Sequence, residues 1–329
     1  MSNTLRLYLH FPCFDGVVSA VLASEYLERL CGWTLECLEP VNYSQRNEWL
    51  SRSFSHPAAV VDFLFHPDAD FWCDHHQTSF LEVNSRVALS GRSPDFFRYD
   101  SSATSCSILL WRSFGDKIGR ADLEQLVQWA DRIDSASYAT PHDAILGTAP
   151  ALKISLSLLA DRSKEYCEFL VNALRKDSLD DVADDPKVSE CFRRIQAAIE
   201  RGLETFKRGA HLENDGIVVY DVVSTEGSIV SRYAPYFFYP EARYSIGISR
   251  FAEGAKITAM RNPWREFVSV PLGRIFSQYG GGGHQRVASL IVTKEELGRS
   301  DSLLKKIIHE IRATELDQWR YPEREVARD

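Results

Sequence analysis

Imidazole, thiol and carboxylate side chains gather in the first quarter of this 329-residue chain. The segments that carry them are HFPCFDG with His10, Cys13 and Asp15, AAVVD with Asp62, and FWCDHH with Asp74, His75 and His76. Such side chains bind divalent cations, and a carboxylate can bridge two of them. Far downstream, the glycine run GGGGH at 280–284 can offer bare backbone N–H groups to an oxyanion. These residue types point to chemistry on metals and oxyanions.

Each of the three N-terminal groups lies at the end of a predicted strand. Residues 4–10 alternate apolar and polar, and a loop then leads into a helical pattern that begins at Asp15. Asp62 ends the apolar run AAVVD, and the triplet DHH at 74–76 follows the strand FWC. In an open parallel sheet, ligands collect at the carboxyl ends of the strands. We therefore expect the three groups to meet in one crevice.

The elements around these residues indicate an α/β fold. Short apolar runs at 33–38, 58–65 and 70–73 follow the first strand, with the polar helical stretch SQRNEWLSRSF between them. Strands that alternate with helices favour a parallel sheet covered by helices.

The chain is predicted to form two domains. From 102 to about 206 helical patterns replace the strands, and from 216 onwards strand patterns return with helices between them. We expect a parallel-sheet domain with a helical extension over 1–185, a connecting helix over 186–212, and a smaller α/β domain over 213–329.

Composition narrows the class of partner. The 38 Lys and Arg against 46 Asp and Glu give a net charge of −8, which leaves no broad basic surface for long nucleic acid. A local basic pocket for a short phosphorylated ligand is compatible with this charge. No run reaches the roughly 18 apolar residues of a membrane span, and the N-terminus lacks a cleavable leader pattern. The seven cysteines are scattered singly. We expect a cytoplasmic protein that does not contact a membrane, and a homodimer is left open.

The order of these motifs resembles that of the DHH phosphoesterases. HFPCFDGVVSA, then Asp62, then DHH at 74–76, then GGGGH at 280–284 form a combination far more specific than DHH alone. The resemblance covers nearly the whole chain. It implies an N-terminal DHH domain that holds two divalent ions, usually manganese. It also implies a C-terminal DHH-associated domain that presents the GGGGH loop to the substrate across a cleft.

The same resemblance implies a ligand set. Asp62 would bridge the ions, His10 would bind the first, and Asp15 and His75 the second. A further aspartate comes from the helical part, where WADRIDSASY offers Asp131 and Asp134. Because the two are three residues apart on one helix face, the sequence does not choose between them. The other would hydrogen-bond to a ligand or cap a helix.

Cys13 departs from the common pattern of the family. Many relatives carry Asp-x-Asp where this chain has Cys13-Phe14-Asp15. As a ligand, a thiolate would shift the first site towards softer ions such as zinc or ferrous iron. As a buried bystander, an unligated thiol would weaken that site instead.

Asp74 and His76 are candidate catalytic residues, because an imidazole beside a metal site can orient a leaving group or donate a proton near neutral pH. The alternative is a hydrogen bond to a metal ligand. Substrate-binding candidates lie in the C-terminal part, and for the two arginines a surface ion pair is the alternative. They are Gly281, Gly282, Gly283, His284, Arg286 and Arg261.

The resulting hypothesis is a metal-dependent phosphoesterase that hydrolyses a short oligonucleotide or a small phosphorylated nucleotide with a metal-activated water. One alternative is a phosphoanhydride hydrolase that acts on polyphosphate or pyrophosphate. Another is a nucleotide-binding regulatory protein whose first metal site has decayed at Cys13. The presence of all the other motifs argues against decay.

Overall fold

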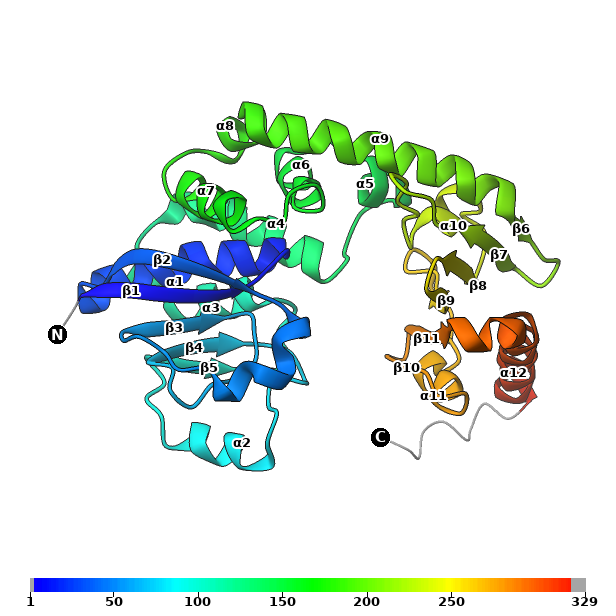
Figure 1. Ribbon diagram of the computed structural model, residues 1–329, viewed down its shortest axis with the longest axis horizontal. Coiled ribbons are helices and arrows are strands. Elements are labelled where there is room, and N and C mark those ends of the chain that lie inside the picture. The colour runs from blue at the N-terminus through cyan, green and yellow to red at the C-terminus, as the bar shows by residue number, and fades with distance from the viewer. Residues whose placement is uncertain (1–2, 321–329) are drawn as a thin grey trace. The chain divides into compact units, whose positions relative to one another are not determined.

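The computed structural model describes residues 3–320, apart from the side chains of 83–85, 88 and 318–320. The chain divides into two compact units (Figure 1). The first unit runs to Tyr138 and again from Gly147 to Ile195, and the second holds Ala139–Leu146 and continues from Gln196. Each unit contains a sheet with helices, so the predicted two-domain α/β fold is confirmed.

The first unit is built on a parallel sheet with the strand order β2-β1-β3-β4-β5. The strands are β1 Thr4–His10, β2 Thr34–Val41, β3 Ala58–Val61, β4 Phe71–Asp74 and β5 Phe97–Tyr99. The order reverses between β1 and β3, and such a reversal opens a crevice at the carboxyl ends of the strands. The predicted strands are found, although β3 ends at Val61 because the next residue leaves the extended conformation with φ of 56°.

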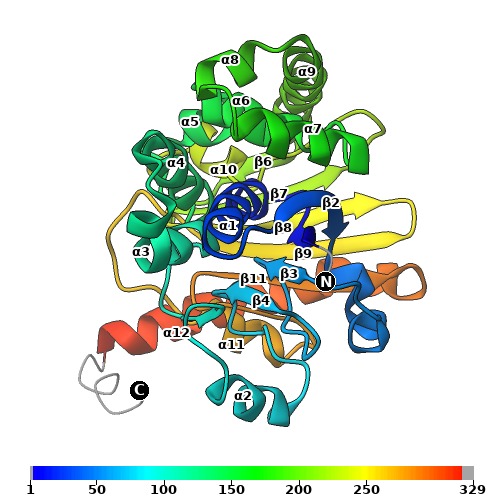
Figure 2. The same ribbon diagram turned by 90° about the vertical axis from the view of Figure 1, so that its left-hand side faces the viewer.

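Two apolar clusters cover the two faces of this sheet. Alternation along β1 sends Leu5, Leu7 and Leu9 to one cluster and Tyr8 to the other. Figure 2 shows α1 and α3 on one side of the sheet and α2 on the other. The elements on the two faces are α1 Phe14–Cys31 and α3 Cys106–Ile118 on the first, and the 3₁₀ helix η1 Tyr43–Ser51 and α2 Val83–Ser90 on the second. The predicted helical stretch before β3 is thus η1.

Residues 102–206 contain helices and no strand within the described part of the chain, as predicted. Within this helical region the apolar segment AILGTAPALKISLSLLA is divided into α5 and α6. Pro150 explains the break, because it lacks an N–H group and begins α6. The helices are η2 Ala121–Leu123, α4 Glu124–Asp134, α5 Pro141–Leu146, α6 Pro150–Ser157, α7 Lys164–Leu174, α8 Leu179–Asp184 and α9 Pro186–Gly209.

The second unit contains a mixed sheet with the order β10-β11-β9-β8-β7-β6, in which β7 and β8 are parallel and the other pairs antiparallel. Its core is formed by β7, β8, β9 and β11 with α11 and α12. The elements are β6 Ala210–Leu212, β7 Ile217–Val223, α10 Ala234–Phe238, β8 Tyr244–Phe251, β9 Gly254–Arg261, α11 Leu272–Ser277, β10 Gly282–Gly283, β11 Val287–Thr293, η3 Lys294–Arg299 and α12 Ser300–Arg320. None of the described helices combines the length and apolar character needed to span a membrane.

Candidate metal centre

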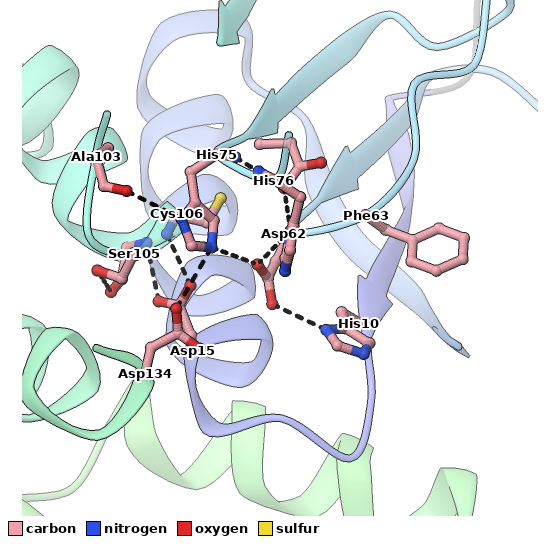
Figure 3. Close-up of polar contacts among 12 residues, drawn as sticks. His10, Asp15, Asp62, Phe63, His75, His76, Ala103, Ser105, Cys106 and Asp134 are labelled. Atoms are coloured by element: carbon pink, nitrogen blue, oxygen red, sulfur yellow. Dashed lines mark hydrogen bonds and ion pairs between the residues drawn. The ribbon is translucent and has the colours of Figure 1, made fainter. Parts of the chain in front are cut away.

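Three adjacent strands place the predicted site residues at one edge of the first sheet. His10 is the last residue of β1, Asp62 directly follows β3, and Asp74 is the last residue of β4. Because the strands are parallel, their carboxyl ends meet. Figure 3 shows His10, His75 and His76 around the Asp62 carboxylate. The structure thus brings the groups from the three strand ends together.

Asp62 stands at the centre of the group. Its carboxylate is 1% exposed, and both oxygens lack a hydrogen-bond partner among the described residues. Oδ2 lies 3.3 Å from His10 Nδ1, and Oδ1 lies 3.7 Å from His75 Nε2. Burial, followed by the charges of neighbouring carboxylates, raises the pKa of Asp62 well above its ordinary value. A buried carboxylate with no donor is costly in the charged form unless a cation compensates it.

The backbone of Asp62 is also unusual. Its φ of 56° lies in the left-handed region, which few residues other than glycine adopt, although Asp and Asn tolerate it better than most. Such local strain is typical of functional sites.

His75 is held in one tautomer. Its Nδ1 lies 3.1 Å from the carbonyl oxygen of Ala103, and since a carbonyl only accepts, Nδ1 carries the proton. The lone pair is left on Nε2, which is buried, has no hydrogen-bond partner in the part of the chain that the structure describes, and lies 3.4 Å from Asp134 Oδ2. A backbone acceptor on the far nitrogen is the usual support of a metal-ligating histidine.

Asp15 is fixed by the start of a helix. Its two oxygens accept hydrogen bonds from the backbone N–H groups of Cys106 at 2.7 Å and Ser107 at 2.9 Å, the first residues of α3. The positive end of the helix dipole favours a carboxylate there. Each oxygen retains a lone pair, and one lies within 4.8 Å of the ligand atoms of His75 and Asp134.

The structure distinguishes Asp134 from Asp131. Asp134 joins Asp15 and His75, and burial, then the charge of Asp15, raises its pKa to about 8. Asp131 instead accepts hydrogen bonds from Thr104 Oγ1 at 2.5 Å and Ser105 Oγ at 2.8 Å. It therefore supports the segment before α3 and lies outside the ligand clusters.

Cys13 lies in a second cluster. It is the N-cap residue of α1, and its side chain makes no capping hydrogen bond. Its Sγ lies within 4.8 Å of a nitrogen of His10 and an oxygen of Asp62. Burial, followed by the charge of Asp62, raises the pKa of the thiol, whereas burial lowers the pKa of His10 to about 4. Without a cation the thiol is protonated and the imidazole is neutral.

Asp74 and His76 form a hydrogen-bonded pair. Asp74 is fully buried, its Oδ1 accepts from His76 Nδ1 at 2.8 Å and from the His75 backbone N–H at 2.8 Å, and its Oδ2 accepts from Ser79 Oγ. Burial alone would lower the pKa of His76, but the hydrogen bond and charge of Asp74 raise it. Asp74 thus orients the His76 ring, and the two also belong to a group of possible metal ligands with Asp62 and His75.

The buried atoms without a hydrogen-bond partner show whether the site suits divalent cations. His10 Nδ1, both oxygens of Asp62 and His75 Nε2 are buried and make no hydrogen bond with any described residue. They are nitrogen and oxygen lone pairs, which suit divalent ions. Asp62 belongs to the cluster His10–Cys13–Asp62, where its Oδ2 faces His10, and its Oδ1 faces His75 of the cluster Asp15–His75–Asp134. The residues fit two ions that share one carboxylate.

The glycine run of the second unit forms a tight hairpin. Gly282 and Gly283 pair with Ser289 and Ala288 of β11, and Gly283 has φ of 150°. A Cβ atom on Gly283 would lie 2.3 Å from the carbonyl oxygen of Val287. Packing against β11 therefore accounts for part of the glycine requirement, and exposed His284 follows the hairpin.

The two predicted arginines differ. Arg261 is 8% exposed, donates to the carbonyl oxygens of Asn262 and Phe267 at 3.1 Å each, and stacks on the Phe267 ring. Burial, then the charge of Arg286, lowers its pKa. Arg286 is exposed. The Arg261 guanidinium is thus bound to carbonyl oxygens of its own unit, whereas the Arg286 side chain is open to solvent.

The groups that orient His75 and Asp15 were not predicted from the sequence. The Ala103 carbonyl and the N–H groups that begin α3 belong to the backbone and carry no side-chain signal. Tyr43, whose ring packs beside His10 and His76, was also not predicted. Its position after β2, at the same sheet edge as His10, is a signal that could have identified it.

A scan against protein-family models finds no match, and neither does a search of curated protein sequences. Solved structures do match. The pGpG-specific phosphodiesterase PggH from Vibrio cholerae is 18% identical, with 94% of this chain and 99% of that chain covered and a TM-score of 0.70. A DHH domain described as part of a ribosomal-protein family member is 10% identical, with coverage of 94% and 86% and a TM-score of 0.58.

RecJ from Thermus thermophilus, solved with Mn²⁺, is 14% identical and has a TM-score of 0.52. The match covers 94% of this chain and 52% of RecJ, so this chain corresponds to about half of that protein. At these identities the likeness establishes the fold, which is the two-domain DHH fold that the motifs predict.

Proposed function

Because the chain combines the DHH fold with the DHH motifs, we propose that it is a metal-dependent phosphoesterase that hydrolyses a short oligonucleotide or a small phosphorylated nucleotide. One observation carries the proposal: buried nitrogen and oxygen lone pairs of His10, Asp62 and His75 have no hydrogen-bond partner within the described residues and face one another. Such an arrangement is unfavourable without cations and typical of a metal centre.

In this proposal the clusters His10–Cys13–Asp62 and Asp15–His75–Asp134 would each hold one divalent ion, and the Asp62 carboxylate, which faces both His10 and His75, would be shared between them. Bound there, the ions would lower the pKa of water and neutralise charge on a phosphoryl group. The protein's own contribution is preorganisation. The Ala103 carbonyl fixes the tautomer of His75, and the first N–H groups of α3 fix Asp15.

His76 acts as the proton donor. Asp74 accepts from Nδ1, which leaves Nε2 free to protonate the leaving oxygen. The raised pKa keeps a larger share of the imidazole protonated near neutral pH. Asp74 contributes by orienting this ring.

The class of substrate follows from charge and accessibility. A net charge of −8 favours a short anion over a long polymer. The exposed His284 and Arg286 are proposed to contact its phosphate. PggH, named as pGpG-specific, makes a linear dinucleotide a sensible first substrate. Manganese is the first ion to test, since RecJ was solved with it, and Cys13 makes zinc and ferrous iron the alternatives.

The experiment is a hydrolysis panel with metal-free protein to which Mn²⁺, Zn²⁺ or Fe²⁺ is returned. The substrates are pGpG, adenosine bisphosphate, a cyclic dinucleotide, pyrophosphate and polyphosphate. We expect turnover of pGpG or the bisphosphate that is lost in His75→Ala. Turnover of the phosphoanhydrides alone would replace the proposal with a phosphoanhydride hydrolase, and nucleotide binding without turnover would indicate a regulatory protein.

A further inference from the structure

Tyr43 lies beside the candidate metal centre at the start of η1. It is the first residue of η1, and the preceding residue, Asn42, forms a capping box with Gln45. In this box the Ser44 N–H donates to Asn42 Oδ1 at 2.9 Å, and the Asn42 N–H donates to Gln45 Oε1 at 3.2 Å. Further along η1, Trp49 Nε1 donates to the Leu64 carbonyl at 3.1 Å. Both ends of the segment are therefore fixed before any ligand arrives.

The ring of Tyr43 packs against two imidazoles of the site. Its centroid lies 5.2 Å from that of His10 and 6.0 Å from that of His76, in edge-on geometry. The side chains of His10 and His76 are 21% and 29% exposed, whereas Asp62 between them is buried. Tyr43 thus lines the partly open side of the site.

The hydroxyl of Tyr43 has no hydrogen-bond partner among the described residues, although it is buried. Burial, followed by the charges of Asp74 and Asp62, raises its pKa, so the group stays a neutral donor. An unpaired buried hydroxyl is unfavourable, and phenylalanine would fill the same space without that cost. No hydrogen bond to a described residue therefore accounts for the hydroxyl.

We propose that the Tyr43 hydroxyl is a catalytic residue that donates a hydrogen bond to a phosphoryl oxygen of the bound substrate. The inference rests on the proposed function. A substrate phosphoryl group brings the acceptor that the protein does not supply, and a neutral donor already fixed in place stabilises its negative charge. No covalent step is assigned to the hydroxyl.

The test is Tyr43→Phe, which removes only the hydroxyl. With inorganic phosphate as the probe, we expect the Mn²⁺-loaded variant to bind about ten- to a hundredfold more weakly than wild type in calorimetry. Turnover of the best substrate from the panel should fall by a similar factor. Metal content should be unchanged, and the melting temperature should stay the same or rise because an unpaired buried hydroxyl is removed.

Tyr26→Phe is the matched control. Tyr26 is buried in the core of the first unit, where its ring stacks on Phe114 and its hydroxyl donates to the Asp95 carbonyl at 3.0 Å. This variant also loses one hydroxyl, but from a satisfied bond away from the site. It should melt at a lower temperature while phosphate affinity and turnover remain those of wild type.

Two results would overturn the inference. Wild-type phosphate affinity and turnover in Tyr43→Phe would mean that an ordinary water satisfies the hydroxyl. Loss of metal from the same variant would mean that the hydroxyl supports the ligands instead of the substrate. Failure of the proposed function is distinguishable, since wild-type protein would then neither bind phosphate nor turn over any substrate.

Discussion

The candidate metal centre of the first unit and the glycine hairpin of the second differ in how their side chains are held. In the cluster, Asp62 and Asp15 are buried, and neighbouring backbone groups fix Asp15 and His75. In the hairpin, His284 and Arg286 are exposed and only the backbone is fixed by pairing with β11. A site for small cations needs lone pairs held in place without water, whereas a loop that contacts a larger anion needs reachable donors. Variants of the first region should therefore lose metal, whereas variants of the second should keep metal and lose substrate affinity or turnover.

The largest effect is expected at Asp62. Asp62→Asn should remove both ions, because one carboxylate serves both clusters, yet should keep the fold, because Asn tolerates the left-handed backbone. Loss of several kcal/mol of charge stabilisation corresponds to at least about a thousandfold lower turnover. Metal analysis and activity of the purified variant are the measurements. Two ions per chain at a near-normal rate would refute the bridging role.

His75→Ala and His284→Ala separate the two regions directly. His75→Ala should lose the ion of the Asp15–His75–Asp134 cluster, because the Nε2 lone pair of His75 faces Asp134. His284→Ala should keep both ions. Its turnover or substrate affinity should fall about ten- to a hundredfold, which is the range for the loss of one hydrogen bond to a charged group. Metal content and steady-state kinetics of the pair decide the matter. Metal loss in His284→Ala would show that His284 is a metal ligand and that the two regions do not have separate roles.

Variants of Cys13 show whether the thiol sets the metal preference of the cluster His10–Cys13–Asp62. As a ligand, Cys13 should favour soft ions, so Cys13→Asp should bind Mn²⁺ about tenfold more tightly at the first site, and Cys13→Ser should bind more weakly. The Co²⁺-loaded wild type should also show a thiolate-to-metal charge-transfer absorption that both variants lack. Identical metal titrations and spectra for all three proteins would show that the thiol does not touch the ion.

The smallest effect is a pH dependence of stability without metal. The pKa of Asp134 rises from 3.8 to about 8 on folding, so the folded state binds the extra proton and stability falls as pH rises towards 8. His10, with its pKa lowered from 6.5 to about 4, acts oppositely, but only below pH 6.5. Between pH 6.5 and 8 the metal-free protein should therefore melt at progressively lower temperature.

The magnitude and the control follow from the same groups. One proton corresponds to at most about 1.4 kcal/mol per pH unit, or a few degrees in melting temperature. Calorimetric melting of wild type and Asp134→Asn should show a shallower slope in the variant, and saturating Mn²⁺ should abolish the slope in wild type. A flat profile for metal-free wild type would contradict the raised pKa of Asp134.

Strand ends and motif order were sufficient to predict the sheet edge on which His10, Asp62 and His75 meet. The choice between Asp131 and Asp134 was beyond the sequence, because both lie on one helix face and only the packing of α4 against the segment before α3 separates them. Burial of Arg261 was likewise invisible, since an arginine pattern does not reveal which carbonyls will surround the guanidinium. Helical periodicity also hid the break at Pro150, which divides α5 from α6.

The position of α5 limits how the protein can be divided into separately expressed domains. Helix α5 is encoded in the middle of the first unit but packs with α10 of the second, where His142 stacks on Phe237. The polypeptide therefore passes between the units three times, after Tyr138, Leu146 and Ile195. A truncation that begins at residue 213 would lack α5, β6 and all of α9, and one that ends at 185 would carry α5 without its packing partner. Neither half can be produced intact as an uninterrupted fragment.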